Sequence, residues 1–360
     1  MSTNIKKHVS ELALDNKCPS CGAPISFHPK LNKWKCVYCN SEFTLSEMQK
    51  HNNASNLKYN KDKEEDKTVY ISHKCQNCGA EIVADEQTAA TFCVYCGSTA
   101  ILQNKLSGEF KPELIIPFKV EKEQAIQAFV NLKKGRPFVP VDFIAKENIE
   151  KIKGIYIPFW LYDVSVAGSV NCNGTRVTSW TRGDTRYTKT DTYAINRTGE
   201  MLFRGIPVDG STRFDNDIMN SIEPFYYEDM TEYNHAYLSG FYAEKYDVSS
   251  EEAYSDAQKR ALNSGKDVMY NDSGAYATKV VVHNSLQEKQ ESNKYALLPV
   301  WMVNVKYKDK MYIFAMNGQT GKFIGDIPLD KKKAWTWGIL LFVGLFCVVG
   351  LFSLLIHYMG

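Results

Sequence analysis

The sequence predicts a multidomain protein with two small cysteine-rich β modules, an α+β domain and one C-terminal transmembrane helix. Four Cys-x-x-Cys pairs come first, strand-like and helix-like patterns follow them, and an apolar run ends the chain. A chain of 360 residues is long enough for two or three domains. Its 21 Tyr and 18 Phe favour a folded, β-containing core over disorder.

The pattern divides the chain into six segments. They are an N-terminal tail (1–16), a first cysteine module (17–45), a polar linker (46–73), a second cysteine module (74–102), an α+β domain (112–330) and a transmembrane helix (335–356). The linker carries the mixed-charge run KDKEEDK, which is typical of a flexible or partly helical connection. The tail has no apolar run and does not resemble a secretory signal peptide. We therefore expect a reducing compartment, in which paired cysteines bind metal.

The two cysteine modules are an internal repeat. Residues 17–45 and 74–102 align at an offset of 57 without a gap, and twelve of 29 positions are identical. Each module has the spacing Cys-x2-Cys-x14-Cys-x2-Cys, with Gly22 or Gly79 directly after the first pair. The sequence therefore predicts one module copied twice.

Four thiolates at this spacing are the ligand set of a structural zinc ion, because zinc prefers a tetrahedron of soft ligands. We predict two such ions, one held by Cys18, Cys21, Cys36 and Cys39 and the other by Cys75, Cys78, Cys93 and Cys96. Disulfides, a redox Cys-x-x-Cys site and an iron–sulfur centre are the alternatives, and the compartment, the fourfold occurrence and the ribbon spacing disfavour them. Four cysteines leave no position for water, so His28 and His73 are expected at the surface.

Charge helps to decide what the modules bind. The first module carries a formal charge of +3 and the second −2. Each zinc–thiolate site adds about −2 more. Affinity for nucleic acid depends on neutralising phosphates with Lys and Arg, so this balance disfavours nucleic acid as a partner. We expect either a rigid platform that binds protein or a purely structural module.

The C-terminal segment is predicted to cross a membrane. Residues 335–356 are 22 residues without charge, which span ~33 Å as a helix. Trp335 and Trp337 mark one interface, and three lysines, Lys331, Lys332 and Lys333, precede the span. By the positive-inside rule these lysines hold the N-terminal bulk in the cytoplasm. We expect a single-pass protein of the cell membrane, anchored in the lipid bilayer by its tail.

Local signals predict several elements of the α+β domain. A helix over 119–135 ends at Gly135, and a second begins after Ser249, with Glu252 completing a capping box. A hairpin over 311–328 turns around Asn317-Gly318 and Gly321. The strand-like run IPFWLYDV (157–164) resembles LPVWMVNV (298–305), so the domain is predicted to contain two related halves.

Charge is distributed unevenly in this domain. Six of the eight arginines lie between Arg176 and Arg213, in a Thr-rich, strand-like stretch with a turn at Gly183-Asp184. Residues 214–256 then hold 11 acids and one lysine. These stretches are interpreted as complementary solvated faces of one domain. The alternative is a docking surface, with the arginines facing acidic protein or lipid headgroups.

The sequence contains no catalytic motif that we recognise. It lacks a phosphate-binding P-loop, a G-x-S-x-G elbow, an H-E-x-x-H helix and a G-x-G-x-x-G fingerprint. Cys172, His235 and Asp163 supply the residue types of a nucleophilic trio but show no local signature for one. We therefore predict a non-enzymatic protein with neither catalytic residues nor an organic cofactor.

The paired modules CPSCGAPI…WKCVYC and CQNCGAEI…TFCVYC, the strand YIPFWLYDV and the terminal span together resemble the bacterial TFIIB-type zinc-ribbon membrane proteins. The resemblance covers most of the chain. It implies an anchor or adaptor in envelope stress, associated with band-7 (SPFH) and phage-shock proteins. Members are often labelled as a replication-restart helicase or primosomal protein, but this chain has no helicase motor motif.

The expected function is therefore a membrane-anchored zinc-ribbon adaptor that binds other proteins at the cytoplasmic membrane face. One alternative is a membrane-tethered, nucleic-acid-binding zinc-ribbon factor related to replication or transcription. A second alternative is a membrane-associated enzyme whose site lies in the α+β domain, and a deep pocket with converging polar side chains is the sign expected of it.

Overall fold

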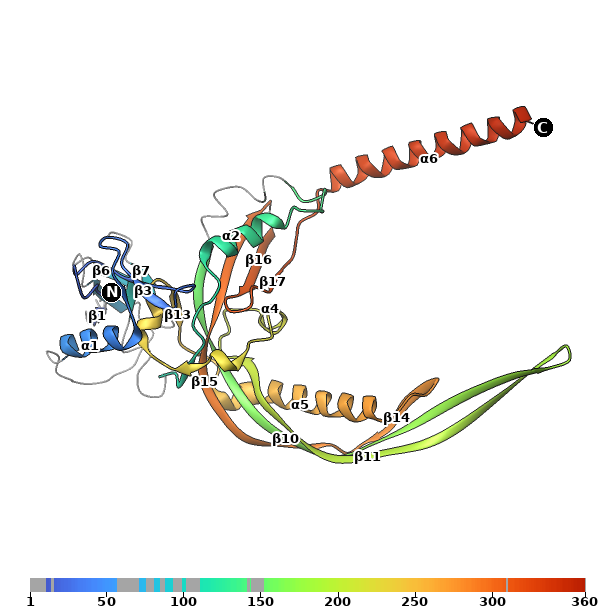
Figure 1. Ribbon diagram of the computed structural model, residues 1–360, viewed down its shortest axis with the longest axis horizontal. Helices are drawn as coiled ribbons and strands as arrows, with labels where there is room; N and C mark the ends of the chain where they lie inside the picture. Colours follow the sequence, from blue (N-terminus) through green and yellow to red (C-terminus); the bar gives the residue numbers. More distant parts are fainter. Residues whose placement is uncertain are drawn as a thin grey trace, which may run out of the picture.

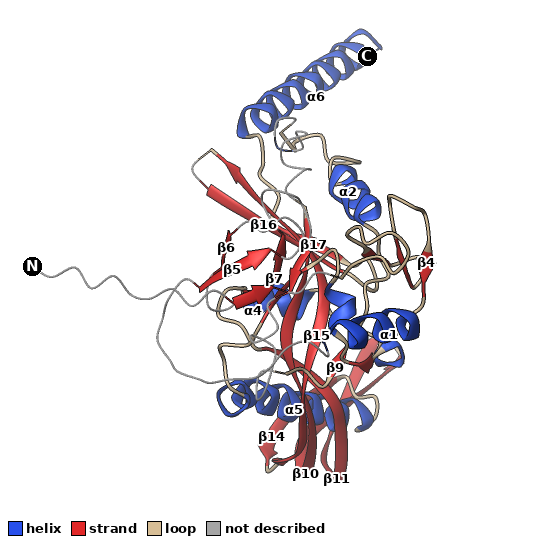
Figure 2. Ribbon diagram, turned by 90° about the vertical axis from the view of Figure 1, so that its left-hand side faces the viewer, coloured by secondary structure: helices blue, strands red, loops and turns tan. Residues whose placement is uncertain are grey.

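The computed structural model of the chain is shown in Figure 1 and Figure 2. It describes residues 11–13, 16–56, 71–75, 81–84, 88–92, 99–101, 111–140, 143, 152–308 and 310–359. The helices are α1 (Leu45–Asn56), α2 (Lys122–Asn131), α4 (Asn216–Ser221), α5 (Ser250–Asp272) and α6 (Lys331–Met359), with 3-10 helices η4 (Tyr227–Asp229) and η5 (His235–Leu238).

The strands follow in chain order. They are β1 (Glu11–Ala13), β2 (Ser26–His28), β3 (Lys33–Lys35), β4 (Glu42–Phe43), β5 (Ile71–Cys75), β6 (Glu81–Ala84), β7 (Thr88–Phe92), β8 (Thr99–Ile101), β9 (Leu114–Ile115), β10 (Lys153–Arg182), β11 (Thr185–Asp209), β12 (Thr231–Glu232), β13 (Tyr242–Glu244), β14 (Thr278–Asn284), β15 (Gln287–Tyr307), β16 (Lys310–Asn317) and β17 (Phe323–Gly325).

A sheet of 11 strands forms the centre of the described structure, which is therefore a large β-rich domain. Its middle is the antiparallel pair of β10 and β15, which runs from Lys153 opposite Met302 to Ala167 opposite Gln287 with one bulge. β11 returns beside β10 as a long curved hairpin, and α5 lies inside the curve (Figure 1). The turn of this hairpin is at Gly183-Asp184, as the sequence predicts.

The strand IPFWLYDV lies where two hydrophobic cores meet. Residues 156–162 of β10 are all buried. Because successive strand residues face opposite sides of a sheet, Tyr156, Trp160 and Tyr162 enter one core while Ile157, Phe159 and Leu161 enter the other. The continuous apolar run is therefore the signature of a strand that is covered on both faces.

α5 approaches the sheet closely through small residues. Its buried positions recur every fourth residue, at Ala253, Ala257, Ala261, Gly265 and Met269. A Cβ atom at Gly265 would lie 3.0 Å from Val166 Cγ1, so glycine permits this helix–sheet distance. The helix begins after Ser249 with the predicted capping box to Glu252. It continues beyond Gly265 because tertiary packing outweighs the weak helix propensity of glycine.

The two similar strand motifs are neighbours in space. Ile157, which opens the first motif, is the direct partner of Leu298, which opens the second. Two residues before each motif, a short parallel strand joins the sheet: β13 pairs at Ile155 and Tyr156, and β9 pairs at Ala296 and Leu297. β9 and β13 are followed by α2 and α5, and both helices begin with a capping box.

The two cysteine modules share their strand register. Trp34 pairs with Phe43 and Lys35 with Glu42 between β3 and β4. At the offset of 57, Thr91 pairs with Ala100 and Phe92 with Thr99 between β7 and β8. The bridge between Lys17 and Pro24 recurs as the pair Lys74 and Glu81. The sequence repeat is therefore also a repeat of backbone pairing.

The modules are attached to the β-rich domain, where the sequence analysis expected separate units on a linker. The first module packs on η5, while β7 of the second pairs with β13 and so extends the large sheet. In Figure 2, β4 and α1 of the first module lie on one side of the molecule, and β5, β6 and β7 lie on the other. Strands of the second module and of the β-rich domain therefore share one sheet.

Helix α1 occupies the start of the segment expected to be a polar linker. Met48, on its inner side, is fully buried in the core of the first module, which explains why this stretch is ordered as a helix. Residues 57–70, the remainder of that linker before β5, lie outside the described residues.

α6 projects from the body at the C-terminal end (Figure 1). It contains a 20-residue stretch, Lys331–Gly350, that is long and apolar enough to cross a membrane. None of that stretch is buried against the rest of the described chain, in contrast to the core helix of a soluble protein.

Candidate metal centre

The first cysteine module brings four thiols together. The Sγ atoms of Cys18, Cys21, Cys36 and Cys39 all lie within 4.8 Å of one another. Cys18 and Cys39 are 3.5 Å apart, Cys21 and Cys36 are 3.6 Å apart, and none of the four forms a disulfide. A tetrahedral ion with bonds of ~2.3 Å to sulfur separates its ligands by about 3.8 Å. The cluster therefore could hold one metal ion.

The two cysteine pairs of this module have the same backbone conformation. In each pair, the backbone amide of the first cysteine donates to the carbonyl oxygen of the residue five positions later. The amide of the residue four positions later donates to the carbonyl oxygen of the first cysteine. These bonds are Cys18 to Ala23 (2.7 Å) and Gly22 to Cys18 (2.8 Å), then Cys36 to Ser41 (3.0 Å) and Asn40 to Cys36 (2.9 Å). Gly22 (φ 72°) and Asn40 (φ 57°) are both left-handed, which glycine and asparagine tolerate best.

The local electrostatics of the four thiols differ. Hydrogen bonds from the Ser41 hydroxyl and amide lower the pKa of Cys39 to about 6. The Ala23 amide lowers the pKa of Cys21, but burial and the neighbouring thiols outweigh it and raise that pKa to about 12. Burial raises the pKa of Cys18. A dication among the four sulfurs favours the thiolate form of each, because opposite charge stabilises it.

Aromatic packing fixes the first module on the β-rich domain. The Trp34 indole nitrogen donates to the carbonyl oxygen of Ala236 (2.9 Å), and the Phe27 amide donates to that of Ser239 (3.1 Å). The ring of Tyr237 lies against both Phe27 (5.3 Å) and Trp34 (5.2 Å). Asn16 adds a hydrogen bond to the Ser239 hydroxyl. The thiol cluster is therefore held at a defined position on the domain.

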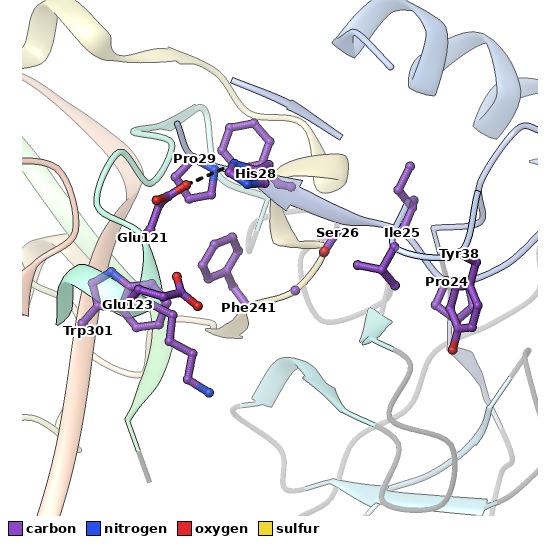
Figure 3. Close-up of a pocket in the computed structure, with 14 residues that line it drawn as sticks. Pro24, Ile25, Ser26, His28, Pro29, Tyr38, Glu121, Glu123, Phe241 and Trp301 are labelled. Atoms are coloured by element: carbon purple, nitrogen blue, oxygen red, sulfur yellow. Dashed lines mark ion pairs between the residues drawn. The ribbon is translucent and has the colours of Figure 1, made fainter. Parts of the chain in front are cut away.

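A cleft of about 540 Å³ lies between this module and α2. Figure 3 shows Glu121 and Trp301 at one end and Tyr38, next to Cys39, at the other. His28 Nδ1 lies 3.3 Å from Glu121 Oε1 and joins the two walls. Phe241 stacks on Phe118, with ring centroids 4.1 Å apart, so that its ring is held firmly in place.

The residues of this cleft come from five separate parts of the chain. His28 was expected simply at the surface, but its side chain is half-buried and reaches the N-terminus of α2. The pairing depends on the docking of the module. No spacing in the sequence signals it, because Glu121 and His28 belong to segments that were assigned to different domains.

The residues of the predicted second metal site lie almost entirely outside the described part of the chain. Cys75 ends β5, where the structure describes only the backbone, and Cys78, Cys93 and Cys96 are not described. His73 likewise lies in β5. The second four-cysteine site therefore stays a prediction from the repeat.

A buried carboxyl group, which the sequence did not single out, lies near the attachment of the second module. Asp209, at the end of β11, is 5% exposed, and its Oδ1 accepts from the Ser211 amide (3.0 Å). Glu244 of β13 is nearby and pairs with Arg213 (2.9 Å). Burial, and then the Asp247 and Glu244 carboxylates, raise the pKa of Asp209 to about 8. The only feature of the sequence that pointed to this region was the unusual density of acidic residues after Arg213.

The structure does not bring the nucleophilic trio together. Asp163 and Cys172 lie nine residues apart on β10, about 30 Å along a strand. Asp163 accepts from the Gly205 amide (2.9 Å) and the Ser292 hydroxyl (2.9 Å), which gives it a structural role. Cys172 is packed among Val170, Ile195 and Met269. Burial lowers the pKa of His235, in η5.

No family model matches the chain, and no solved structure matches it. A relative is found in Bacillus subtilis (strain 168), with the description "Uncharacterized protein YdjG". It is 33% identical over 344 residues, which cover 96% of this chain and 98% of the relative. The similarity therefore extends across nearly the whole of both chains.

Proposed function

The chain belongs to the family of the Bacillus subtilis protein YdjG, and we propose that it is a membrane-anchored zinc-ribbon adaptor that binds other proteins at the cytoplasmic membrane face. The observation that carries this proposal is the position of the thiol cluster. It is fixed on the β-rich domain, while the tip of its second cysteine pair, Val37 and Tyr38, is 74% and 72% exposed.

Zinc is the ion that the donor set fits best. Four cysteine sulfurs in a small antiparallel sheet with two equivalent tight turns match a closed tetrahedral site. Such a site leaves no position for water and so supports a structural role. The matching register of the second module supports a second ion at Cys75, Cys78, Cys93 and Cys96.

The cleft beside Tyr38 provides the shape expected of a protein-binding surface. Its floor includes Phe241 and Trp301, and Glu121 and Glu123 contribute carboxylates at its α2 end. Exposed tyrosine and a rigid aromatic floor are typical of interface hot spots. The resemblance to TFIIB-type zinc-ribbon membrane proteins favours band-7 (SPFH) or phage-shock proteins as the partners.

Membrane anchoring follows from α6. Its apolar stretch is uncovered and begins with Lys331, Lys332 and Lys333, which favours a cytoplasmic location for the domain and the modules. Within the β-rich domain, the paired motifs and the matching positions of β9 and β13 support an origin from two related halves. Such a domain positions the modules relative to the membrane helix.

Site-specific photocrosslinking tests the adaptor proposal. A photoreactive amino acid at position 38 of the full-length chain, expressed in its own cells, is expected to crosslink to a band-7 or phage-shock protein. The matched control is position 226, where Tyr226 is also exposed (56%) but belongs to the β-rich domain. Equal crosslinking from both positions, or none from position 38, contradicts the proposal. Crosslinking to nucleic acid from position 38 supports the alternative of a nucleic-acid-binding factor.

A further inference from the structure

The end of the β10–β11 hairpin has no protein cover among the described residues. β14 accompanies β10 only as far as Thr175, which pairs with Thr278. Beyond that point, residues 176–190 are all exposed, and β10 and β11 pair only with each other in the described structure. A two-stranded hairpin without a covered face is marginally stable in water. This arm, residues 176–190, is therefore suited to contact something outside the chain.

One face of the arm combines aromatic and basic side chains. Trp180 lies directly opposite Tyr187, and their rings are stacked with centroids 5.7 Å apart. Because strand residues alternate between faces, the neighbouring pairs on this face contribute Lys189, which forms an ion pair with Asp191 (3.0 Å), on one side and Arg182 on the other. Trp180 is 48% exposed and Tyr187 44%. The other face is mostly Thr and Ser, with Arg186 near the turn.

The start of α6 has the same composition. Lys331, Lys332 and Lys333 are followed within one turn by Trp335 and then by Trp337, both exposed. Lysine beside tryptophan is the usual arrangement at the boundary between lipid headgroups and acyl chains. The arm and the start of α6 thus present the same chemistry, although they are far apart in the sequence.

In the view of Figure 1, the two places also lie along one edge of the body. In Figure 1, a straight line from the first residues of α6 to the tip of the arm leaves the labelled elements of the body on one side. α6 alone lies on the other side of that line. A flat bilayer surface along this line would contact the body at both places while α6 enters the membrane.

We propose that the tip of the β10–β11 hairpin is a second membrane contact, which places Trp180 and Tyr187 among the lipid headgroups and directs Arg182 and Arg186 to anionic lipid. Anionic lipids attract such clusters of Lys and Arg, and the attraction falls with salt. The contact fixes the orientation of the domain above the bilayer. This inference rests on the membrane anchoring proposed above.

An acidic protein is the competing partner for a basic, aromatic arm. The bilayer is favoured because the arm tip and the start of α6 share a composition and lie along the same edge of the body in the view of Figure 1. Binding of an acidic protein would not require the arm tip and the start of α6 to share a composition or an edge of the body. A lipid contact also explains why the aromatic pair lies near the turn, where only the tip of a protruding arm reaches the headgroup layer.

Fluorescence quenching by brominated lipid in nanodiscs tests the contact with the full-length chain. The emission of Trp180 is obtained as the difference between the wild type and W180F. In nanodiscs that contain phosphatidylglycerol, brominated lipid is expected to reduce this emission roughly twofold, because Trp at the headgroup level lies within reach of the quencher. High salt, or the double substitution R182E/R186E, is expected to restore it. The charge-matched control is K30E/K50E, which alters one exposed lysine of the first module and one of α1.

The experiment separates this inference from the membrane anchoring. Quenching of Trp335 and Trp337, measured as the difference between the wild type and W335F/W337F, reports insertion of α6. If those residues are quenched and Trp180 is not, the anchoring holds and the second contact is refuted, as expected if the arm binds an acidic protein. Equal quenching of Trp180 in purely zwitterionic nanodiscs refutes the role of anionic lipid.

Discussion

Trp34 donates its indole N–H to the backbone carbonyl of Ala236 over 2.9 Å, although the two residues are 202 positions apart in the chain. Trp34 is 1% exposed, whereas its neighbours in β3, Lys33 and Lys35, are only partly buried. The bond and the surrounding rings connect a module that could hold a metal ion to the domain that carries the apolar helix α6. The module is therefore an integral part of the molecule rather than a tethered appendage.

Substitution of Trp34 should loosen the module without removing its thiols. W34F keeps an aromatic ring but removes the indole N–H that donates to the Ala236 carbonyl, which then keeps only the Ser239 amide and hydroxyl as donors, so the free energy of unfolding should fall by about 1 kcal/mol. W34A also leaves a cavity and should cost about 3–5 kcal/mol. Urea unfolding of the full-length protein in detergent measures both. Y38F changes an exposed ring on the same module and serves as the control; if W34A is no more costly than Y38F, the docking described here is wrong.

Sequence reasoning predicted the elements whose signals are local. The capping box of Ser249 and Glu252, the turn at Gly183-Asp184 and the apolar C-terminal helix depend on a few adjacent residues, and the structure confirms them. The repeat offset of 57 also predicted the shared strand register. These features need no knowledge of the rest of the fold.

The arrangement of the modules was not predictable, because it depends on long-range contacts. Nothing near Trp34 indicates that η5 accepts its hydrogen bond, and nothing near Thr88 indicates that β7 pairs with Glu244 of β13. The polar composition after residue 45 favoured a flexible or partly helical linker, and the start of that segment is helix α1, whose Met48 is buried in the core. The arm is uncovered because β14 stops pairing with β10 at Thr175. The sequence around Thr278 has no strong signal that predicts this limit of the strand.

Loss of either set of four cysteines should remove one zinc ion per chain without affecting the ion held by the other set. We expect the wild type to contain two zinc ions per chain, and C18S and C75S to contain one each. C172S is the matched control, because Cys172 is a buried cysteine outside both sets. Elemental analysis of protein purified without added metal measures the ratio. An unchanged ratio in C18S contradicts the first site, and a wild-type ratio of one contradicts the second.

The buried carboxyl of Asp209 should make stability depend on pH. Its pKa is raised from 3.8 to about 8 in the folded protein, so the folded state holds a proton that the unfolded state releases between these values. The stabilisation by that proton is complete below about pH 4 and is lost as the pH rises through 8, with a slope of at most ~1.4 kcal/mol per pH unit.

The substitution D209N should remove this slope, because the amide is neutral at every pH. Compared with the wild type, D209N should gain stability progressively between pH 5 and pH 8, measured by urea unfolding at each pH. D267N removes an exposed carboxylate of α5 and should leave the slope unchanged. Parallel curves for D209N and the wild type would show that Asp209 is ionised in the folded protein at neutral pH.

The contact between Gly240 and Ser26 should set how closely the first module approaches the domain. Gly240 has a φ of +91°, and a Cβ atom there would lie 2.9 Å from the Ser26 Cβ. G240A therefore combines backbone strain with a collision at the module interface. G135A is the matched control, because Gly135 has a φ of +72° but no atom within 4 Å of the added Cβ.

Both substitutions should cost about 1 kcal/mol in strain, and only G240A should also displace the module. Limited proteolysis should then release the first module from G240A faster than from G135A, at equal metal content. Equal release from the two variants would mean that strain alone accounts for the loss and that the module does not depend on this close approach.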